Sequence, residues 1–188
     1  MQTDKSRLRT SILCDFETIS AVECLEASEL IARNVLDLPE LREPVSLMLF
    51  LSTPGEVDTD PLVRGCLAAG HRVYAPRTLR RLRRMIPVRL RSLDDVVVGS
   101  FGIREPAGDE TVEPAELDVV IVPAVAFDRT CGRLGRGGGY YDRFICELRS
   151  GAVTCGVALS RHVIDAVPTE PHDRPVDIVV TERGVMRR

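Results

Sequence analysis

A glycine-rich stretch that also carries arginines is the part of this sequence best suited to chemistry. Residues 131–144 read CGRLGRGGGYYDRF, in which four glycines surround Arg136. Glycine lets an anion approach the main chain closely, and arginine supplies paired donors for phosphate oxygens. A β-branched run at residues 117–122 lies upstream, and helical spacing over residues 141–148 follows. The pattern therefore predicts an anion-binding loop between a strand and a helix.

Two well-known phosphate loops do not fit this stretch. The P-loop pattern fits Gly132 and Gly137 but requires lysine where the chain has Gly138. The dinucleotide-binding fingerprint, begun at Gly135, requires glycine where the chain has Tyr140. A flexible surface turn is the plain alternative, but the arginines and the placement before a helix favour a functional loop.

Two aspartates and a lysine are further candidates. Asp142 and Asp173 are hard oxygen donors of the kind that Mg²⁺ binds, although aspartate is also common in caps and turns. Lys5 is the only lysine in the chain, and Arg9 follows one helical turn later, so that both can point the same way. Together they could contact a phosphate, or they could lie on a solvated helix face.

The motif RLGRGGGYYD, preceded by VPAVAFD, strongly resembles that of the 5-formyltetrahydrofolate cyclo-ligases, also called methenyltetrahydrofolate synthetases. The resemblance covers nearly the whole chain and includes an N-terminal KxxLR pattern, the segment GEVDTDPL and the turn FGIREP. It implies a conversion of 5-formyltetrahydrofolate to 5,10-methenyltetrahydrofolate that depends on ATP and Mg²⁺. The formyl group would be phosphorylated on the way, and ADP and phosphate would be released.

The resemblance also implies roles for residues that match the motifs of the family. ATP is expected to contact Lys5, Arg9, Arg133, Leu134, Gly135, Arg136, Gly137, Gly138, Gly139, Tyr140 and Tyr141. The folate is expected to contact Leu51, Glu56, Arg136 and Tyr140, of which Arg136 and Tyr140 would be catalytic. Asp142 and Asp173 would bind Mg²⁺. The plain alternatives are a turn cap for Glu56 and core packing for Tyr140. Some relatives have lysine at the position of Gly138, so that Arg136 would act here without a second charge.

The elements that must position these residues alternate between helix and strand. Helices are expected over residues 5–16 and over residues 162–167. A further helix should begin at the capping box of Ser20 and Glu23 and end at about Leu36, and another should begin at an N-cap at Asp60 and end at Gly70. Strands are expected over residues 45–51, 72–75, 117–122, 153–159 and, as the last of the sheet, 176–181. This order predicts an α/β fold, a three-layer sandwich with a largely parallel, Rossmann-like central sheet.

Ligands of such sheets collect beyond the carboxyl ends of the strands. Glu56 follows the expected strand at residues 45–51, and the glycine stretch follows the one at residues 117–122. We therefore expect the two loops to meet over one cleft.

Residues 77–91 form an unusual segment with seven arginines and no aromatic residue. A nucleic-acid patch would usually include aromatic side chains for stacking, and the chain as a whole is acidic. A charged, partly exposed hairpin or loop is the plain interpretation. A sharper hypothesis is that some of these arginines bind the glutamate tail of a folate, so that the substrate could be polyglutamylated.

The composition sets the remaining bounds. A chain of 188 residues with 44% hydrophobic and 28% charged residues is typical of one globular domain, expected here over residues 1–188. The net charge of -3 and the lack of a long apolar run indicate neither a nucleic-acid nor a membrane partner. Six cysteines without a CxxC pair indicate free thiols. We expect a cytoplasmic monomer acting on a small-molecule substrate; an anion sensor of the same fold and an RNA-binding protein remain alternatives.

Overall fold

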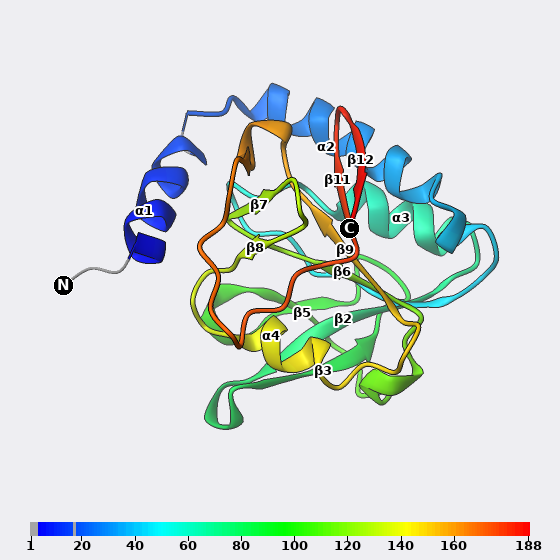
Figure 1. Cartoon of the computed structure of the whole chain (residues 1–188). Coiled ribbons are helices and arrows are strands. Elements are labelled where there is room, and N and C mark those ends of the chain that lie inside the picture. Colours follow the sequence, from blue (N-terminus) through cyan, green and yellow to red (C-terminus); the bar gives the residue numbers. More distant parts are fainter. Residues whose placement is uncertain (1–3, 17) are drawn as a thin grey trace.

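A seven-stranded sheet forms the centre of the computed structural model, which describes residues 4–16 and 18–188. The strands run in the order β12–β11–β9–β6–β1–β2–β3 (Figure 1). Their bounds are β1 (Ser46–Met48), β2 (Arg72–Leu79), β3 (Arg84–Arg89), β6 (Val119–Val122), β9 (Val153–Val157), β11 (Ile178–Thr181) and β12 (Gly184–Arg187). Neighbouring strands from β11 to β2 pair in parallel, whereas the edge strands β12 and β3 pair antiparallel. The prediction of an α/β fold with a largely parallel sheet is confirmed.

Helices cover both faces of the sheet. They are α1 (Asp4–Phe16), α2 (Ala21–Leu36), α3 (Asp60–Ala68) and α4 (Tyr140–Ile145). α2 and α3 lie on one face and the short α4 lies on the other, which makes the sheet the middle of three layers (Figure 1). α1 stands at the margin of the molecule, and no helix in the described part of the chain has both the length and the apolar character needed to cross a bilayer.

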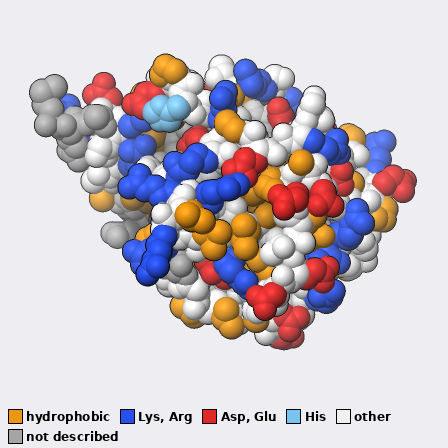
Figure 2. Space-filling view, turned by 90° about the horizontal axis from the view of Figure 1, so that it is seen from below, with side chains coloured by type: hydrophobic (Ala, Val, Ile, Leu, Met, Phe, Trp, Pro, Cys, Tyr) orange, Lys and Arg blue, Asp and Glu red, His pale blue; other side chains and the backbone are white. Residues whose placement is uncertain are grey.

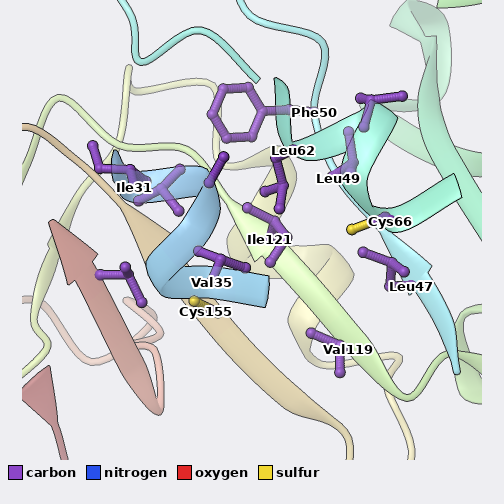
Figure 3. Packing of buried hydrophobic residues seen from close by; sticks show 14 of the residues in the cluster. Ile31, Val35, Leu47, Leu49, Phe50, Leu62, Cys66, Val119, Ile121 and Cys155 are labelled. Atoms are coloured by element: carbon purple, nitrogen blue, oxygen red, sulfur yellow. The ribbon is translucent and has the colours of Figure 1, made fainter. Parts of the chain in front are cut away.

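The core explains why the central strands are continuous apolar runs. All residues of β1 and β6 are buried, because helices or loops cover both faces of a parallel sheet. On the α2–α3 side, Ile31, Val35 and Leu62 pack in one cluster with Leu47 and Ile121 (Figure 3). A second cluster on the other face includes Phe144 of α4 with Met48, Val120 and Phe127.

The start of α3 differs from the expectation. The N-cap residue is Thr59 and not Asp60, and the helix ends at Ala68. The Asp60 carboxylate instead accepts hydrogen bonds from Arg104 of the strand β5 (Arg104–Pro106), at 2.7 and 3.0 Å. The Thr59 hydroxyl donates to the carbonyl oxygen of Phe50, which ties the start of the helix to the chain after β1.

Two other helical expectations are wrong in part or in whole. The helix expected at residues 141–148 is α4, which ends at Ile145. In each of the next three residues the backbone N–H donates a hydrogen bond to the carbonyl oxygen three positions earlier, as in a 3₁₀ turn. The helix expected at residues 162–167 is absent. There the chain forms the short strand β10 (Val163–Ile164), which pairs in parallel with β7 (Ala126–Asp128).

Both edges of the sheet are hairpins. The strand expected at residues 176–181 is β11, but it is not the last, because the chain turns back after Thr181 and adds β12. At the other edge, β2 and β3 form an antiparallel hairpin that contains most of residues 77–91. This confirms the interpretation of that arginine-rich segment as a charged hairpin.

Candidate active site

A cleft of about 860 Å³ lies over the glycine stretch. Its volume falls in the range of about 300–1,000 Å³ that is usual for small-molecule sites. Its walls come from α1, the loop after β1, the β2–β3 hairpin, the glycine stretch and the loop before β11. Every residue that the sequence analysis assigned to ATP, folate or Mg²⁺ lines this cleft.

The glycine loop, residues 135–139, connects the two-residue strand β8 (Arg133–Leu134) to α4. Gly137 and Gly139 have positive φ angles of 96° and 64°, which only glycine adopts at little cost. At Gly138, an added Cβ atom would lie 2.9 Å from the ring of Tyr140. The ring would therefore have to move before a larger side chain could enter at this position.

The sequence analysis expected the glycine loop to follow β6 directly, and this expectation is wrong. The hairpin of β7 and β8 intervenes, and Asp128 organises its turn. One carboxylate oxygen of Asp128 accepts the N–H groups of Thr130 and Gly132 at 2.8 and 2.9 Å, and the other accepts the N–H of Val167 at 2.9 Å. Burial opposes ionisation of Asp128, but these donors outweigh it and lower its pKa. The sequence reasoning missed this residue, although the spacing Asp-x-Thr is typical of an Asx turn.

α1 brings two cations to the glycine loop. The Nζ atom of Lys5 makes an ion pair with Asp173 and lies 3.5 Å from the carboxylate of Glu170. The Nε atom of Arg9 donates to the carbonyl oxygen of Gly135 at 2.7 Å. Because these contacts join α1 to two distant loops, the helix closes one side of the cleft.

Arg133 and Tyr141 hold polar groups that are buried at this cleft. The guanidinium group of Arg133 makes an ion pair with Asp142, and its side chain is only 4% exposed. Within the described residues, the Arg133 Nε atom and the Tyr141 hydroxyl are buried and have no hydrogen-bond partner. Burial raises the pKa of Tyr141, so the phenol remains a donor at neutral pH. Buried donors without a protein partner are rare in native proteins, so these two atoms mark the cleft as a candidate functional site.

Arg136 and Glu56 join the two loops that were expected to meet. The Arg136 guanidinium donates to the Glu56 carboxylate at 2.9 and 3.1 Å. The second carboxylate oxygen of Glu56 accepts the N–H and the hydroxyl of Thr53, at 2.9 and 3.0 Å. The expected meeting of the loops over one cleft is confirmed, and Glu56 is ion-paired as well as capping its turn.

The carboxylates of Asp142 and Asp173 fit Mg²⁺ in donor class, because this ion prefers carboxylate oxygens. The backbone N–H of Arg174 donates to Asp142 at 3.2 Å, so that the two aspartates lie on adjoining segments. Partial burial opposes the ionisation of Asp173, but the Lys5 ammonium and a backbone N–H outweigh it and lower its pKa. Ligand atoms of Glu170, His172 and Asp173 lie within 4.8 Å of one another.

The apolar lining of the cleft was largely missed from sequence. Phe50, Pro76, Met85, Phe101 and Ile103 contribute to it. Phe101 is 58% exposed and has a left-handed φ of 61°, which is rare for an aromatic residue. The turn FGIREP is part of the family resemblance, and the aromatic residue at this exposed turn is the sequence signal that the turn belongs to the site.

Comparison with known proteins agrees with this geometry. The model of the 5-formyltetrahydrofolate cyclo-ligase family matches residues 1–182. A 5-formyltetrahydrofolate cyclo-ligase of Haemophilus influenzae is 32% identical over 187 residues, which cover 96% of this chain and 100% of that protein. A mouse protein of the same description is 29% identical, with 95% and 93% covered.

Solved structures give the same result. The 5,10-methenyltetrahydrofolate synthetase of Aquifex aeolicus superposes with a TM-score of 0.87 at 35% identity, covering 98% of this chain and 93% of that one. A synthetase of Mycoplasma pneumoniae, at 21% identity and a TM-score of 0.77, shares the fold. With the family model spanning nearly the whole chain and the matching residues gathered at one cleft, this chain belongs to the 5-formyltetrahydrofolate cyclo-ligase family.

Proposed function

We propose that the protein converts 5-formyltetrahydrofolate to 5,10-methenyltetrahydrofolate with ATP and Mg²⁺, releasing ADP and phosphate. The observation that carries the proposal is that one cleft combines four cationic side chains around a glycine loop with an apolar lining. The cations are Lys5, Arg9, Arg133 and Arg136. A site of this kind suits a polyanion next to an aromatic ring system.

The glycine loop and its cations support the nucleotide part of the proposal. Two glycines with positive φ allow the backbone to approach phosphate oxygens closely. The unpaired Nε of Arg133 is a buried, charged donor at the same place. Arg9 and Lys5 add positive charge from α1, so the phosphates would lie between α1 and the glycine loop.

Glu56, Leu51 and Tyr140 support the folate part. The Glu56 carboxylate can accept the N–H groups of a pterin, and its side chain is only 11% exposed. Leu51 and the ring of Tyr140 offer apolar surface in the same cleft. Arg136 lies between the two parts, because it belongs to the glycine loop and contacts Glu56.

The proposed chemistry balances with these two substrates alone. The oxygen of the formyl group on N5 is a poor leaving group until it accepts the γ-phosphoryl group of ATP. This transfer releases ADP. N10 of the folate then attacks the formyl carbon and loses its proton, and the carbon–oxygen bond breaks with release of phosphate. Phosphoryl transfer requires mainly positioning and charge neutralisation, which Arg133 and Arg136 can supply.

Asp142 and Asp173 would hold Mg²⁺, which supplies further neutralisation of phosphate charge. Each aspartate is now paired with a cation, Arg133 or Lys5. Sharing these carboxylates with a metal ion would leave both cations available to phosphate oxygens.

The test is the near-ultraviolet absorbance of the methenyl product, which the substrate lacks. Purified protein with ATP, Mg²⁺ and 5-formyltetrahydrofolate should build this band, and Arg136→Ala and Asp142→Asn should lose most of it. Arg64→Gln, which removes an exposed charge on α3, is the matched control and should keep it. If the folded protein builds no band and calorimetry detects binding of neither nucleotide nor folate, the proposal is wrong.

A further inference from the structure

Glu105 of β5 is a buried acidic residue that the proposed chemistry does not use. The residue is only 6% exposed, and β5 lies alongside β2 (Figure 1). The Oε1 atom of Glu105 accepts the backbone N–H of Thr78 in β2 at 3.0 Å, so it joins two segments that are 27 residues apart in the chain. Burying a carboxylate costs free energy, which makes a structural or functional task for this side chain the natural expectation.

The hydrogen bond to Glu105 lies where the cleft opens beside β2. The pairing of β2 with β1 ends at Tyr74, whereas its pairing with β3 continues to Leu79. The carbonyl oxygen of Tyr74 faces β1, because it accepts the N–H of Leu49. Alternate residues of a strand point their backbone polar groups to the same side, so the N–H of Thr78 faces the side that β1 has left. Glu105 thus takes the place of a strand partner.

The turn that precedes Glu105 forms an apolar wall of the cleft. Phe101 and Ile103 in this turn both line the cleft. Figure 2, which views the molecule from the side of α4 and β3, shows hydrophobic side chains gathered between basic and acidic ones. The left-handed backbone of Phe101 is unfavourable for any residue other than glycine, and such a conformation persists only where surrounding contacts hold it.

Two consecutive side chains anchor this turn on opposite sides. Arg104 donates to the Asp60 carboxylate and, at 3.5 Å, to the hydroxyl of Ser52. Ser52 and Asp60 flank the loop that carries Glu56. Successive residues of a strand point to opposite faces, so Glu105 reaches β2 instead. The turn is therefore held between two other walls of the cleft, the β2–β3 hairpin and the Glu56 loop.

Gly99 leaves room for the Glu105 carboxylate. A Cβ atom on Gly99 would lie 2.2 Å from Oε2 and 2.3 Å from Cδ of Glu105. The N–H of Gly99 donates to the carbonyl oxygen of Ile103 at 2.8 Å and so closes the turn. The carboxylate and the backbone of the turn are packed against each other, and a change in either should move the wall.

We propose that Glu105 is a positioning residue, which fixes the wall of Phe101 and Ile103 in the place where it packs against the ring system of the folate. This inference rests on the proposed function. The wall is apolar and adjoins the Glu56 loop through Arg104, whereas the cations proposed for the phosphates surround the glycine loop. A wall that is fixed before the ligand arrives loses little entropy on binding. Because the carboxylate acts by accepting a hydrogen bond, a neutral acceptor of the same size should replace it.

The experiment compares Glu105→Ala with Glu105→Gln. The control is Glu26→Ala, which removes an exposed carboxylate from α2 and gives the same net charge as Glu105→Ala. Absorbance kinetics give separate KM values for 5-formyltetrahydrofolate and ATP. We expect Glu105→Ala to raise the folate KM by about tenfold, because the Thr78 N–H loses its acceptor, and to change the KM for ATP by less than about twofold. Glu105→Gln and the control should keep both values of the unmodified protein.

Gly99→Ala is the second variant, and it keeps the inference testable if Glu105→Ala does not fold. By displacing the carboxylate it should raise the folate KM alone, but it should add nothing in a Glu105→Ala background, where the clashing atoms are gone. An unchanged folate KM in the single variants that fold would overturn the inference, as would an equal rise in the KM for ATP.

Turnover by the unmodified protein separates the two levels. If no methenyl product forms, the proposed function fails and the role of Glu105 fails with it. If product forms and Glu105→Ala behaves like the control, only the positioning role fails.

Discussion

The guanidinium group of Arg136 and the carboxylate of Glu56 lie 2.9 Å apart although 80 residues separate them in the chain. The pair joins the loop that follows β1 to the glycine loop. The Arg136 side chain is 52% exposed and the Glu56 side chain 11%, so the arginine is free to turn toward a ligand while the glutamate stays in place. The contact therefore couples the proposed folate side of the cleft to the nucleotide side.

Replacing Glu56 with glutamine tests its proposed contact with the folate. The substitution keeps the size of the side chain but removes its charge, and with it the strong acceptor for a pterin. We expect the KM for 5-formyltetrahydrofolate to rise by about tenfold or more, since a charged hydrogen bond contributes about 1.5–3 kcal/mol. Steady-state absorbance kinetics measure this, with the exposed Glu26→Gln on α2 as the control. Equal KM values for Glu56→Gln and the control would remove Glu56 from the folate site.

Gly137 and Gly70 make a matched pair for testing the glycine loop. Their φ angles are 96° and 82°, so alanine costs each of them about 1–2 kcal/mol of backbone strain. A Cβ atom on Gly70 would meet nothing within 4 Å, and one on Gly137 would lie 3.7 Å from Arg9, which is ordinary contact. Chemical denaturation should show similar losses of stability, but only Gly137→Ala should raise the KM for ATP. An unaffected KM would show that the loop backbone does not contact the nucleotide.

Asp128 should be essential to the turn that leads into the glycine loop. Asparagine at this position would place an amide NH₂ against a backbone N–H that now donates to a carboxylate. We expect Asp128→Asn to lower the free energy of unfolding by about 1–3 kcal/mol and to weaken nucleotide binding, because Arg133 lies at the end of this turn. Asp109→Asn, at a 93% exposed ion-paired residue, should cost less than about 1 kcal/mol in urea titrations. Similar losses in both variants would contradict this role.

His71 should make the fold less stable in mild acid. Its Nδ1 atom accepts the N–H of Val45 at 3.1 Å, and burial lowers its pKa below the ordinary 6.5. The unfolded chain therefore takes up this proton more readily, so the stability is full above pH 6.5 and falls as the pH drops toward the folded pKa, by at most about 1.4 kcal/mol per pH unit. His71→Asn keeps an acceptor but does not titrate. Urea titrations at neutral and mildly acidic pH should show a smaller acid loss in the variant; an equal loss would point to other groups.

Features encoded by local sequence could be predicted. The reciprocal bonds of Ser20 and Glu23 start α2 as expected, because a capping box needs only neighbouring residues. The strands at residues 45–51 and 117–122 were found as apolar runs, although β1 and β6 are shorter because only their central residues pair. The meeting of the Glu56 loop with the glycine loop followed from the rule that loops gather beyond the carboxyl ends of parallel strands, whereas the individual site residues came from the family resemblance.

Features that depend on distant partners could not be predicted. Asp60 has the sequence context of an N-cap, but Arg104, far along the chain, takes its carboxylate. β8 has two residues and exists only through its pairing with β7, so no local pattern marks it. The ion pair of Arg133 with Asp142 likewise depends on the path of the glycine loop. The functional roles of the site residues remain predictions that the kinetic experiments above test.

α1 carries Lys5 and Arg9 at the margin of the molecule (Figure 1). The C-terminal end of the helix is held by an ion pair of Asp15 with Arg161 and by the packing of the Phe16 ring against the His162 ring. Under the proposed function, phosphates that contact both cations would stabilise α1 in its place beside the glycine loop, and an α1 held there would raise the affinity for the nucleotide by the same factor. Amide hydrogen exchange of α1 would then report nucleotide binding without any turnover.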